Sequence, residues 1–448
     1  MTTVQRYGDL ELGFQIVHAV QPITSTLAVY DVHHGVSGTD WMKTGVKLGP
    51  QGAKPGGLLL RDRSSDGSLL RRPVGWQRIG EIPTPGTKTG IWRPIPPPGY
   101  VALGDYIAVW STSDPALLPE FYTQFACVKK IHNGRNYVRE GEVGTKLHEA
   151  NGLRVWSVVA PPYPDGDQDE RLYLPSGCLT VVTSSGTPAP TATTWILDLP
   201  AVVERREGPE IPELTSFARP PAQTSIADRT VTVPYYLIDD KGRDEEWKVA
   251  NSPFYKVRRK RHYELILFRD NRNGSESQPE SQAVTTGVTR TAEESFRTST
   301  GMTVGVSVGV EAGAKPFGIG ASTTVTTSIS TTIELGYERR TSVATMREET
   351  KNRGLNVPPR SSACLWMEHH EIVPIRANGD TLGSQAALGF TTDYYVTGEY
   401  PGGSRAAYFE EAADGARTDG PARHLAPDTE LSTRPQTQEP APVTADFE

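Results

Sequence analysis

The segment from Met302 to Tyr337 alternates between apolar and small polar residues in two runs joined by a short loop. Because side chains of a strand point to opposite faces with a period of two, the pattern predicts a β-hairpin with one apolar face. The apolar positions of the two runs are Met302, Val304, Val306, Val308, Val310, Ala312 and Ala314, then Ile319, Ala321, Val325, Ile329 and Ile333.

The connecting loop is Lys315-Pro316-Phe317-Gly318. Its position sets the register in which the two runs would pair. A hairpin closing around Pro316-Phe317 sets Val308 opposite Val325. A register shift of one residue would place the apolar face of one strand against the polar face of the other. The predicted register is therefore well specified.

The length of the first run suits a lipid bilayer. At roughly 3.3 Å per residue and a tilt of about 45°, the strand from Met302 to Ala314 covers about 30 Å, the thickness of a hydrocarbon core. An isolated hairpin would leave edge N–H and C=O groups unpaired in lipid at several kcal/mol each, so only a closed ring of hairpins satisfies the backbone. The sequence predicts an oligomeric β-barrel, with Glu311 and Lys315 facing the lumen.

A half-buried hairpin in a soluble β-sandwich is the alternative, because alternation of this kind also occurs in ordinary antiparallel sheets. Two features favour the barrel. Ser, Thr and Gly occupy the non-apolar face where a solvent-facing strand normally carries Lys, Glu and Arg, and the strands are long for a globular domain.

The bulk composition predicts a mostly β protein. Among 448 residues there are 43 Gly and 36 Pro, which indicates many short strands and turns, and the length suits two or three domains. The net charge of −7 gives no reason to expect nucleic acid as a partner. The widely spaced Cys127, Cys178 and Cys364 predict buried thiols and neither a disulfide framework nor a zinc site.

The expected localisation follows from two absences in the sequence. The N-terminus lacks the apolar run of a secretory signal, and no stretch of eighteen apolar residues occurs. We expect a soluble protein without a signal peptide, released on lysis or by an unconventional route, that then acts at a target-cell membrane.

Composition shifts along the chain predict four parts. Residues 1–203 form a β module, residues 204–228 a Pro-rich linker, residues 229–401 an elongated β domain, and residues 402–448 a disordered acidic tail. The tail is also a possible activation segment, because cleavage after an arginine would release acidic sequence; the candidates are Arg405, Arg417 and Arg423.

The sequence WRPIPPPGYVALGD, from Trp92 to Asp105, is the most distinctive stretch of the first part. It resembles the signature of the vacuolar protein sorting-associated protein sixty-two family, and the likeness extends over roughly the first two hundred residues. The resemblance implies an all-β targeting module. The prolines from Pro94 to Pro98 require a sheet edge or a loop, and Trp92 is either structural or stacks on a ligand.

The second half resembles aerolysin-like pore-forming toxins of the epsilon-toxin and mosquitocidal-toxin type. The elements that carry the resemblance are a Ser/Thr-rich strand over Arg297–Ala314, the loop with Pro316 and Phe317, a second Ser/Thr-rich strand over Ile319–Glu338, the segment Val357–Ser362 and the apolar strand Ala363–Pro374. The resemblance implies that the protein binds a membrane, assembles and inserts the hairpin, with the loop anchoring it on the far side.

Three other segments leave alternatives open. The basic run from Tyr255 to His262 is either a charged edge strand or a surface for anionic head groups and phosphates. The acidic segment from Asp165 to Asp169 departs from a calcium loop, since Glu170 replaces the required Gly, and is expected to be a solvated loop. The pairs His33-His34 and His369-His370 point to opposite faces of a strand, a poor geometry for metal.

The sequence contains none of the GxSxG, HExxH or phosphate-loop motifs, so we expect no enzyme, no cofactor and no metal. The predicted partners are a target-membrane lipid or receptor and further copies of the chain on that membrane. The alternative function is a soluble lectin-like or trafficking module that never enters lipid.

Overall fold

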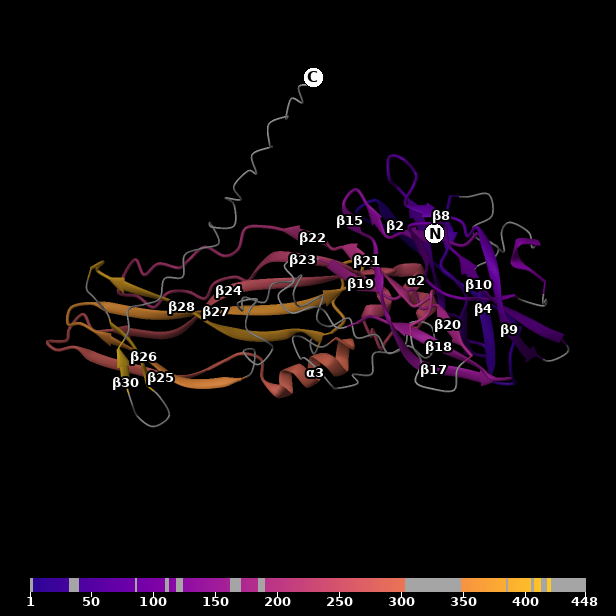
Figure 1. The fold of residues 1–448 in the computed structure, drawn as a ribbon. Helices are drawn as coiled ribbons and strands as arrows, with labels where there is room; N and C mark the ends of the chain where they lie inside the picture. Colours follow the sequence, from indigo (N-terminus) through magenta and orange to yellow (C-terminus); the bar gives the residue numbers. More distant parts are fainter. Residues whose placement is uncertain are drawn as a thin grey trace, which may run out of the picture.

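The computed structural model describes residues 3–31, 40–84, 87–108, 113–117, 124–161, 171–183, 190–302, 348–383, 386–403, 407–411 and 417–419. These residues form many antiparallel sheets and few helical turns, which confirms the predicted mostly β class. Figure 1 shows a rounded part built from the N-terminal strands at one end, and long strands that run away from it. Among the helices of the described residues, none has the length and apolar character to cross a membrane.

The rounded part, which we call the head, contains seven small sheets within its described residues. The first two sheets are β1 (Val4–Tyr7), β2 (Leu10–Ile16), β7 (Gly56–Asp62) and β5 (Met42–Lys43), and β3 (His18–Pro22), β4 (Leu27–Asp31) and β6 (Lys47–Pro50). The next three are β12 (Tyr106–Ala108), β10 (Thr87–Ile95) and β9 (Gly75–Thr84); β11 (Tyr100–Ala102), β13 (Cys127–Lys129) and β8 (Leu70–Arg71); and β14 (Ile131–His132) with β15 (Arg135–Asn136).

The last two head sheets are β16 (Val138–Glu140), β21 (Trp195–Pro200) and β19 (Arg171–Leu174), and β17 (Glu142–Ala150), β18 (Leu153–Val159) and β20 (Leu179–Val182). A 3-10 turn, η1, spans Pro115–Leu117. As expected from the sequence, Cys127, Cys178 and Cys364 are buried free thiols.

In the elongated part, the residues that the structure describes form two sheets. The long sheet is β22 (Val202–Arg205), β23 (Ile226–Pro234), β24 (Phe254–Asp270), β27 (Ser362–Ile375) and β28 (Leu388–Tyr400), in that order. The distal sheet is β25 (Gln278–Thr286), β26 (Glu349–Val357), β29 (Ala407–Glu411) and β30 (Arg417–Asp419). At about 3.3 Å per residue, β24 alone extends roughly 55 Å. The helical elements are η2 (Tyr235–Leu237), α2 (Glu245–Asn251) and α3 (Arg290–Thr300).

One hydrophobic cluster joins the head to the long sheet. Phe14 of β2 lies edge-on to Tyr235, with ring centroids 5.1 Å apart, and 5.5 Å from the ring of Phe254. The same cluster holds Leu58 and Leu60 of β7 and Val231 of β23, all at most 2% exposed. Burial of these large apolar side chains couples the two parts in one core.

The segment expected to be a linker is extended and follows the long sheet. Between β22 and β23, Leu214 is 8% exposed and packs in a cluster with Tyr263 and Trp366. Phe217 lies edge-on to Tyr400, with centroids 5.0 Å apart. Both ends of the expected linker belong to strands, residues 204–205 to β22 and residues 226–228 to β23. Between them the prolines disfavour a regular strand, and Leu214 and Phe217 hold the segment against the sheet.

The distinctive WRPIPPPGYVALGD segment has a structural role in the head. Trp92 is 7% exposed within a core cluster that includes Tyr106 and Phe125, which favours the structural interpretation of this residue. Arg93 donates to both carboxylate oxygens of the fully buried Asp105, each at 2.8 Å. Among the described residues, β12 pairs with Gly90 to Trp92 and not with Pro94, whose strand neighbour there is Trp76 of β9. This position suits a residue that has no backbone N–H to donate.

Three parts of the structure differ from the sequence-based expectations. Residues Arg297–Thr300, expected to begin a strand, belong to helix α3. Within the segment expected to be disordered, Ala407–Glu411 forms β29, because Tyr408 and Phe409 are apolar enough to be buried. The interpretation of the basic run as an edge strand is wrong, since β24 is the third of five strands in the long sheet.

Candidate functional site at the base of the predicted hairpin

The predicted hairpin and its loop lie outside the described residues, apart from Met302. The structure therefore describes the base from which this segment leaves and to which it returns. On the entry side are β25 and α3, and on the exit side is β26. β25 and β26 are antiparallel neighbours, paired from Gln278↔Val357 to Thr286↔Glu349. The chain thus enters the segment from the end of α3 and leaves it into β26, which is hydrogen-bonded to the strand before α3.

Helix α3 is fixed at its start by side-chain capping. The Thr289 hydroxyl accepts a hydrogen bond from the backbone N–H of Ala292, at 3.1 Å, and satisfies one of the free donors of the first turn. Glu293 in the first turn and Arg297 in the last complement the helix dipole. Local sequence chemistry therefore favours a helix here over a strand.

Helix α3 ends at a glycine C-cap, and its C-terminal part packs in the hydrophobic cluster that joins the head to the long sheet. Gly301 adopts a φ of 67° and its N–H donates to the Arg297 carbonyl at 2.8 Å. Asp239 donates its backbone N–H to the Thr300 carbonyl at 2.7 Å. Phe296 is fully buried and Met302 is 3% exposed, both in the cluster that joins the head to the long sheet.

A cavity of about 480 Å³ opens beside this helix end, with Thr298 and Ser299 on one wall. Arg376 and Asp240 also line this cavity, and Arg376 donates to both oxygens of Asp240, at 2.7 and 3.0 Å. Burial alone raises the pKa of Asp240, but the hydrogen bonds from Arg376 and Tyr255 outweigh it and lower the pKa. The cavity wall is therefore an ionised, fixed pair at the point where the predicted hairpin begins.

The distal sheet, which includes β25 and β26 at the base of the predicted hairpin, has few buried residues in β25. Its β25 strand is largely exposed, with Val284 as a buried residue near the end. β29 pairs with β26 along Asn352–Asn356, on the side away from β25. Tyr408 of β29 stacks on Tyr395 with centroids 4.2 Å apart, and its hydroxyl accepts from Arg353 at 2.9 Å. A C-terminal segment therefore covers the outer edge of the strand that follows the hairpin.

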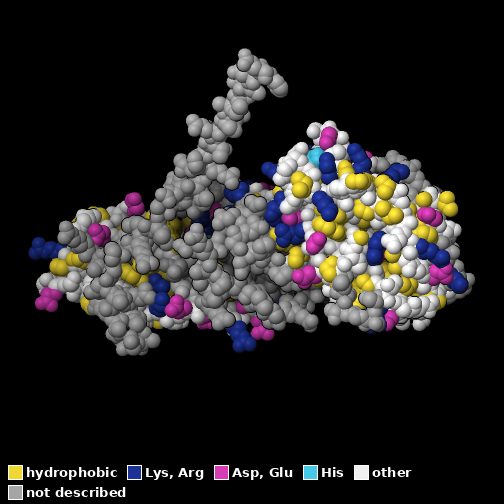
Figure 2. All heavy atoms as spheres, in the orientation of Figure 1, with side chains coloured by type: hydrophobic (Ala, Val, Ile, Leu, Met, Phe, Trp, Pro, Cys, Tyr) yellow, Lys and Arg dark blue, Asp and Glu magenta, His cyan; other side chains and the backbone are white. Residues whose placement is uncertain are grey.

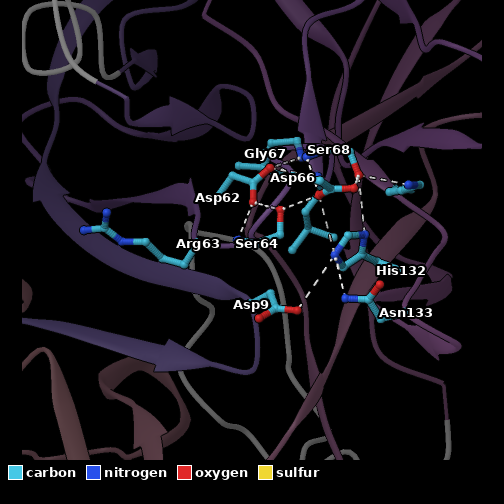
Figure 3. Close-up of polar contacts among 12 residues, drawn as sticks. Asp9, Asp62, Arg63, Ser64, Asp66, Gly67, Ser68, His132 and Asn133 are labelled. Atoms are coloured by element: carbon cyan, nitrogen blue, oxygen red, sulfur yellow. Dashed lines mark hydrogen bonds and ion pairs between the residues drawn. The ribbon is translucent and has the colours of Figure 1, made fainter.

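A second polar cluster, in the head, was not singled out by the sequence. Figure 3 shows the turn after β7, where Asp62 and Asp66 alternate with Ser64 and Ser68, close to His132. Asp62 accepts from the backbone N–H groups of Leu69 and Leu70, at 2.7 and 3.1 Å. Its second oxygen accepts from the Ser64 N–H at 2.8 Å. The Asp62 carboxylate therefore stabilises its own turn by accepting hydrogen bonds from the backbone of that turn.

The histidine of this cluster is buried between two acids. His132 is 3% exposed, and its Nε2 lies 3.8 Å from Asp9 and 3.9 Å from Asp66 (Figure 3). Hydrogen bonds from the Ser68 hydroxyl and N–H hold the pKa of Asp66 well below its usual range. The arrangement stabilises the β7–β8 turn. Within the described ranges, no group of three or more His, Cys, Asp or Glu side chains is placed to hold a metal ion.

The remaining sequence candidates lie in two places. The acidic segment at 165–169 and the pair His33-His34 are outside the described residues. His369 and His370 lie on β27 and face opposite sides of the long sheet, as predicted: His369 packs on His262, with ring centroids 4.9 Å apart, and His370 stacks on Phe390 at 5.1 Å.

Comparison with known proteins gives one family match. Residues 229–392 match the family described as Insecticidal Crystal Toxin, P42. The match begins in β23 and ends in β28, so it includes the predicted hairpin and its base and leaves the head outside. No curated protein sequence matches the chain.

Two solved structures are similar to parts of the chain. GNIP1Aa from Chromobacterium piscinae is 21% identical, with a TM-score of 0.29; the match covers 40% of this chain and spans 34% of that chain. Cry35Ab1 is 10% identical, with a TM-score of 0.32, and the match covers 89% of this chain and 91% of that chain. The sequence match identifies residues 229–392 as similar to the insecticidal crystal toxin P42 family.

Proposed function

We propose that this protein is a pore-forming toxin that binds a target membrane, assembles into a homo-oligomer and inserts a β-barrel built from the 302–337 hairpin. The observation that carries the proposal is the match of residues 229–392 to the insecticidal crystal toxin family, which includes the one segment with bilayer-length apolar alternation. In this proposal the head targets the protein to the membrane, and the elongated part forms the pore.

The base of the hairpin supports this proposal through its topology. The segment leaves from the end of α3 and returns to β26, and β26 pairs with β25, the strand that precedes α3. If α3 became extended, the hairpin would continue the existing β25–β26 ladder. In the water-soluble protein, α3 and Met302 are held in the main core by burial of Phe296. Insertion then requires α3 to give up these contacts.

The targeting role belongs to the head in this proposal. Figure 2 shows hydrophobic side chains spread among polar ones on the visible face of the head. Large apolar side chains exposed in this part include Val74, Ile95, Leu117 and Ile131, at 68, 43, 81 and 58%. Single apolar side chains of this kind are common on protein surfaces, so the assignment of targeting to the head rests mainly on the resemblance of its sequence.

The test is dye release from liposomes and target cells by variants with one added charge. Asp at Val308 or Ile329 (V308D, I329D) places a carboxylate on the lipid face and is expected to reduce release at least tenfold, since a charge on that face is destabilising near the bilayer centre and every subunit of the barrel would carry one. The matched control is Ser328→Asp, beside Ile329 on the lumen face, which is expected to retain release.

Full release by V308D and I329D would show that this segment does not cross the bilayer. Absence of release by the unchanged protein, after trial proteolysis and across several lipid and cell types, would favour the soluble lectin-like or trafficking module instead. Removal of both charges with E311Q and K315Q is expected to alter the ion preference of the pore while leaving release intact.

A further inference from the structure

The second half of β24 extends beyond the strand that neighbours its first half. β27 pairs with β24 as far as Asp270, whereas β23 pairs with β24 no further than Arg261. Within the residues that the structure describes, no strand pairs with His262–Asp270 on the β23 side. Such an edge presents backbone N–H and C=O groups to which a strand of another chain can add.

The connection between β22 and β23 lies against this edge. Figure 1 shows residues 206–225, which we call the strap, running beside the long strands away from the head and back. The Gln223 side-chain oxygen accepts the backbone N–H of Tyr263 at 3.0 Å. The Ser225 hydroxyl lies 3.0 Å from Nδ1 of His262. The strap therefore gives an edge N–H group of β24 a side-chain acceptor in place of a strand.

The far end of the strap is held by two apolar side chains. Leu214, 8% exposed, packs in a cluster with Tyr263 and Trp366. Phe217 lies edge-on to Tyr400, with ring centroids 5.0 Å apart. Both contacts are made to the part of the long sheet that lies beyond β23, so the strap covers this part of the sheet.

The attachment of the strap is weaker than strand pairing. Among the described residues, no backbone–backbone hydrogen bond joins residues 207–225 to His262–Asp270. Apart from Leu214, the side chains of the strap are exposed or half-buried. Residues without an N–H to donate interrupt it at Pro209, Pro212, Pro220 and Pro221. A segment with so few buried contacts and backbone hydrogen bonds opens at a low free-energy cost.

The opposite edge of the same sheet lies at the same level. In the described residues this edge is β28. Asp270 of β24 pairs with Ser362 of β27, and Ser362 pairs with Tyr400 of β28. Because β24 and β28 are both antiparallel to β27, they run in the same direction. A rotation axis along the strands would therefore bring β28 of one copy beside β24 of the next, at one level and in parallel.

We propose that the strap is a removable cover, and that the second half of β24 pairs with β28 of a second copy when the protein assembles. This inference rests on the proposed function, because it names the surface through which the homo-oligomer forms. The interface is heterologous: each copy offers β24 to one neighbour and β28 to the other, as a closed ring requires. Strand pairing satisfies edge N–H and C=O groups that the strap does not bond.

The first test loosens the strap. Leu214→Ser removes its buried anchor and is expected to speed oligomer formation on liposomes at least about fivefold, because the apolar burial that holds the strap is lost. The matched control in the same strap is Ile211→Ser, since Ile211 is already 43% exposed. Its rate is expected to stay within about twofold. Amine-reactive cross-linking over time measures assembly, and an equal rate for Leu214→Ser and the unchanged protein would overturn the proposal.

A second variant leaves the hydrophobic cluster intact. Gln223→Ala removes the acceptor of the Tyr263 N–H and is expected to speed assembly about threefold, whereas Thr224→Ala, at the exposed neighbouring position, is expected to have no effect. The midpoint of thermal unfolding is measured for all of these variants. A lower midpoint in Leu214→Ser without faster assembly in Gln223→Ala would show that the strap only stabilises the sheet, and would overturn the proposal.

Mixtures of single-cysteine proteins identify the paired strands. Glu264→Cys on β24 and Thr397→Cys on β28 are expected to be joined by a bismaleimide reagent on liposomes and not in solution. Gln77→Cys, at an exposed position of β9 in the head, replaces Thr397→Cys in the control and is expected to give no product. Oligomers and dye release without the β24–β28 product would overturn this interface alone, whereas absence of oligomers and of dye release would overturn the proposed function as well.

Discussion

Ionised side chains form a continuous chain across the face of the long sheet. Asp228 lies against Arg259 and Arg261, and Glu368 lies 2.7 Å from Arg261 and 3.2 Å from His370. Burial raises the pKa of Glu368, but the hydrogen bond to His370 and the charges of His370 and Arg261 outweigh it and bring the pKa to about 2. Each buried charge is thus paired, as the cost of an isolated one demands.

On the opposite face of the long sheet, the environment of His369 disfavours its protonated form. Burial lowers the pKa of His369 to about 4, with further lowering by His262 and His370 and a small opposing effect of Glu371. His262 contacts it across the ladder and itself hydrogen-bonds the Ser225 hydroxyl at 3.0 Å. Protonation of His369 therefore works against the folded sheet.

The first residue-scale prediction is a loss of stability in acid. Because the folded-state pKa of His369 lies below the value of about 6.5 in an unfolded chain, its contribution is complete above pH 6.5 and is lost as pH falls toward 4. His369→Gln is expected to reduce this acid loss by on the order of 1–2 kcal/mol, discounted for partial exposure. Urea unfolding at pH 8, 6 and 4 measures it; an identical acid loss in both proteins would contradict the assignment.

At the scale of single elements, two sequence patterns meet where α3 ends: helix-capping residues favour a helix before this point, and apolar alternation favours a strand after it. Thr289 at the start and Gly301 at the end give this stretch a complete set of helix signals. The alternation begins only at Met302, which explains why a strand predicted from Arg297 is too long by one helical turn. The helix signals can be read from the sequence. The strand was predicted from Arg297 because the resemblance to aerolysin-like toxins implies a Ser/Thr-rich strand there.

The predicted hairpin register gives an element-scale prediction. Cysteines at Val306 and at its predicted cross-strand neighbour Thr327 are expected to form a disulfide in the assembled pore, since opposed Cβ atoms lie about 4.5–5.5 Å apart. Pairing Val306 with Ser328 instead provides the control for a shifted register. Preferential cross-linking of the control pair, measured by reactivity under mild oxidation, would refute the register.

The C-terminal strands give a second element-scale prediction. A chain ending at Gly403 lacks β29 and exposes the outer edge of β26, so we expect it to self-associate on membranes faster than the full chain, by tenfold or more. The matched control ends at Gly420, which retains β29 and β30. Cross-linking of oligomers on liposomes measures the effect; equal rates for both truncations would contradict a protective role of β29.

At the scale of the molecule, the head and the long sheet share one core. Tyr7 of the head donates its hydroxyl to the Thr232 carbonyl of β23 at 3.2 Å, and Phe14 packs among Tyr235, Tyr236 and Phe254. The division into residues 1–203 and 229–401 remains a prediction. The shared cluster indicates that the two parts are energetically coupled.

The molecular-scale prediction concerns this coupling. Phe14→Ala is expected to cost about 3–5 kcal/mol and to speed hydrogen exchange in both β7 and β24, because the cavity it leaves opens between the two parts. Phe217→Ala, on the segment that follows the far end of the long sheet, is the control and is expected to affect only its neighbourhood. Faster exchange confined to the head strands would show that the two parts are independent.

The sequence by itself determined the mostly β class and the burial of the three thiols, because each follows from composition or local pattern. The amphipathic hairpin, which the same kind of pattern predicts, stays a prediction. The sequence did not determine that the basic run lies in a central strand, that the Pro-rich segment follows the long sheet, or that Tyr408 and Phe409 bring a tail segment onto β26. These facts depend on partners distant in the chain: Asp228 and Glu368 for the arginines, Tyr263 and Trp366 for Leu214, and Tyr395 for Tyr408. Only the tertiary structure decides such pairings, since a charge or an aromatic ring has no preferred environment until its neighbours are in place.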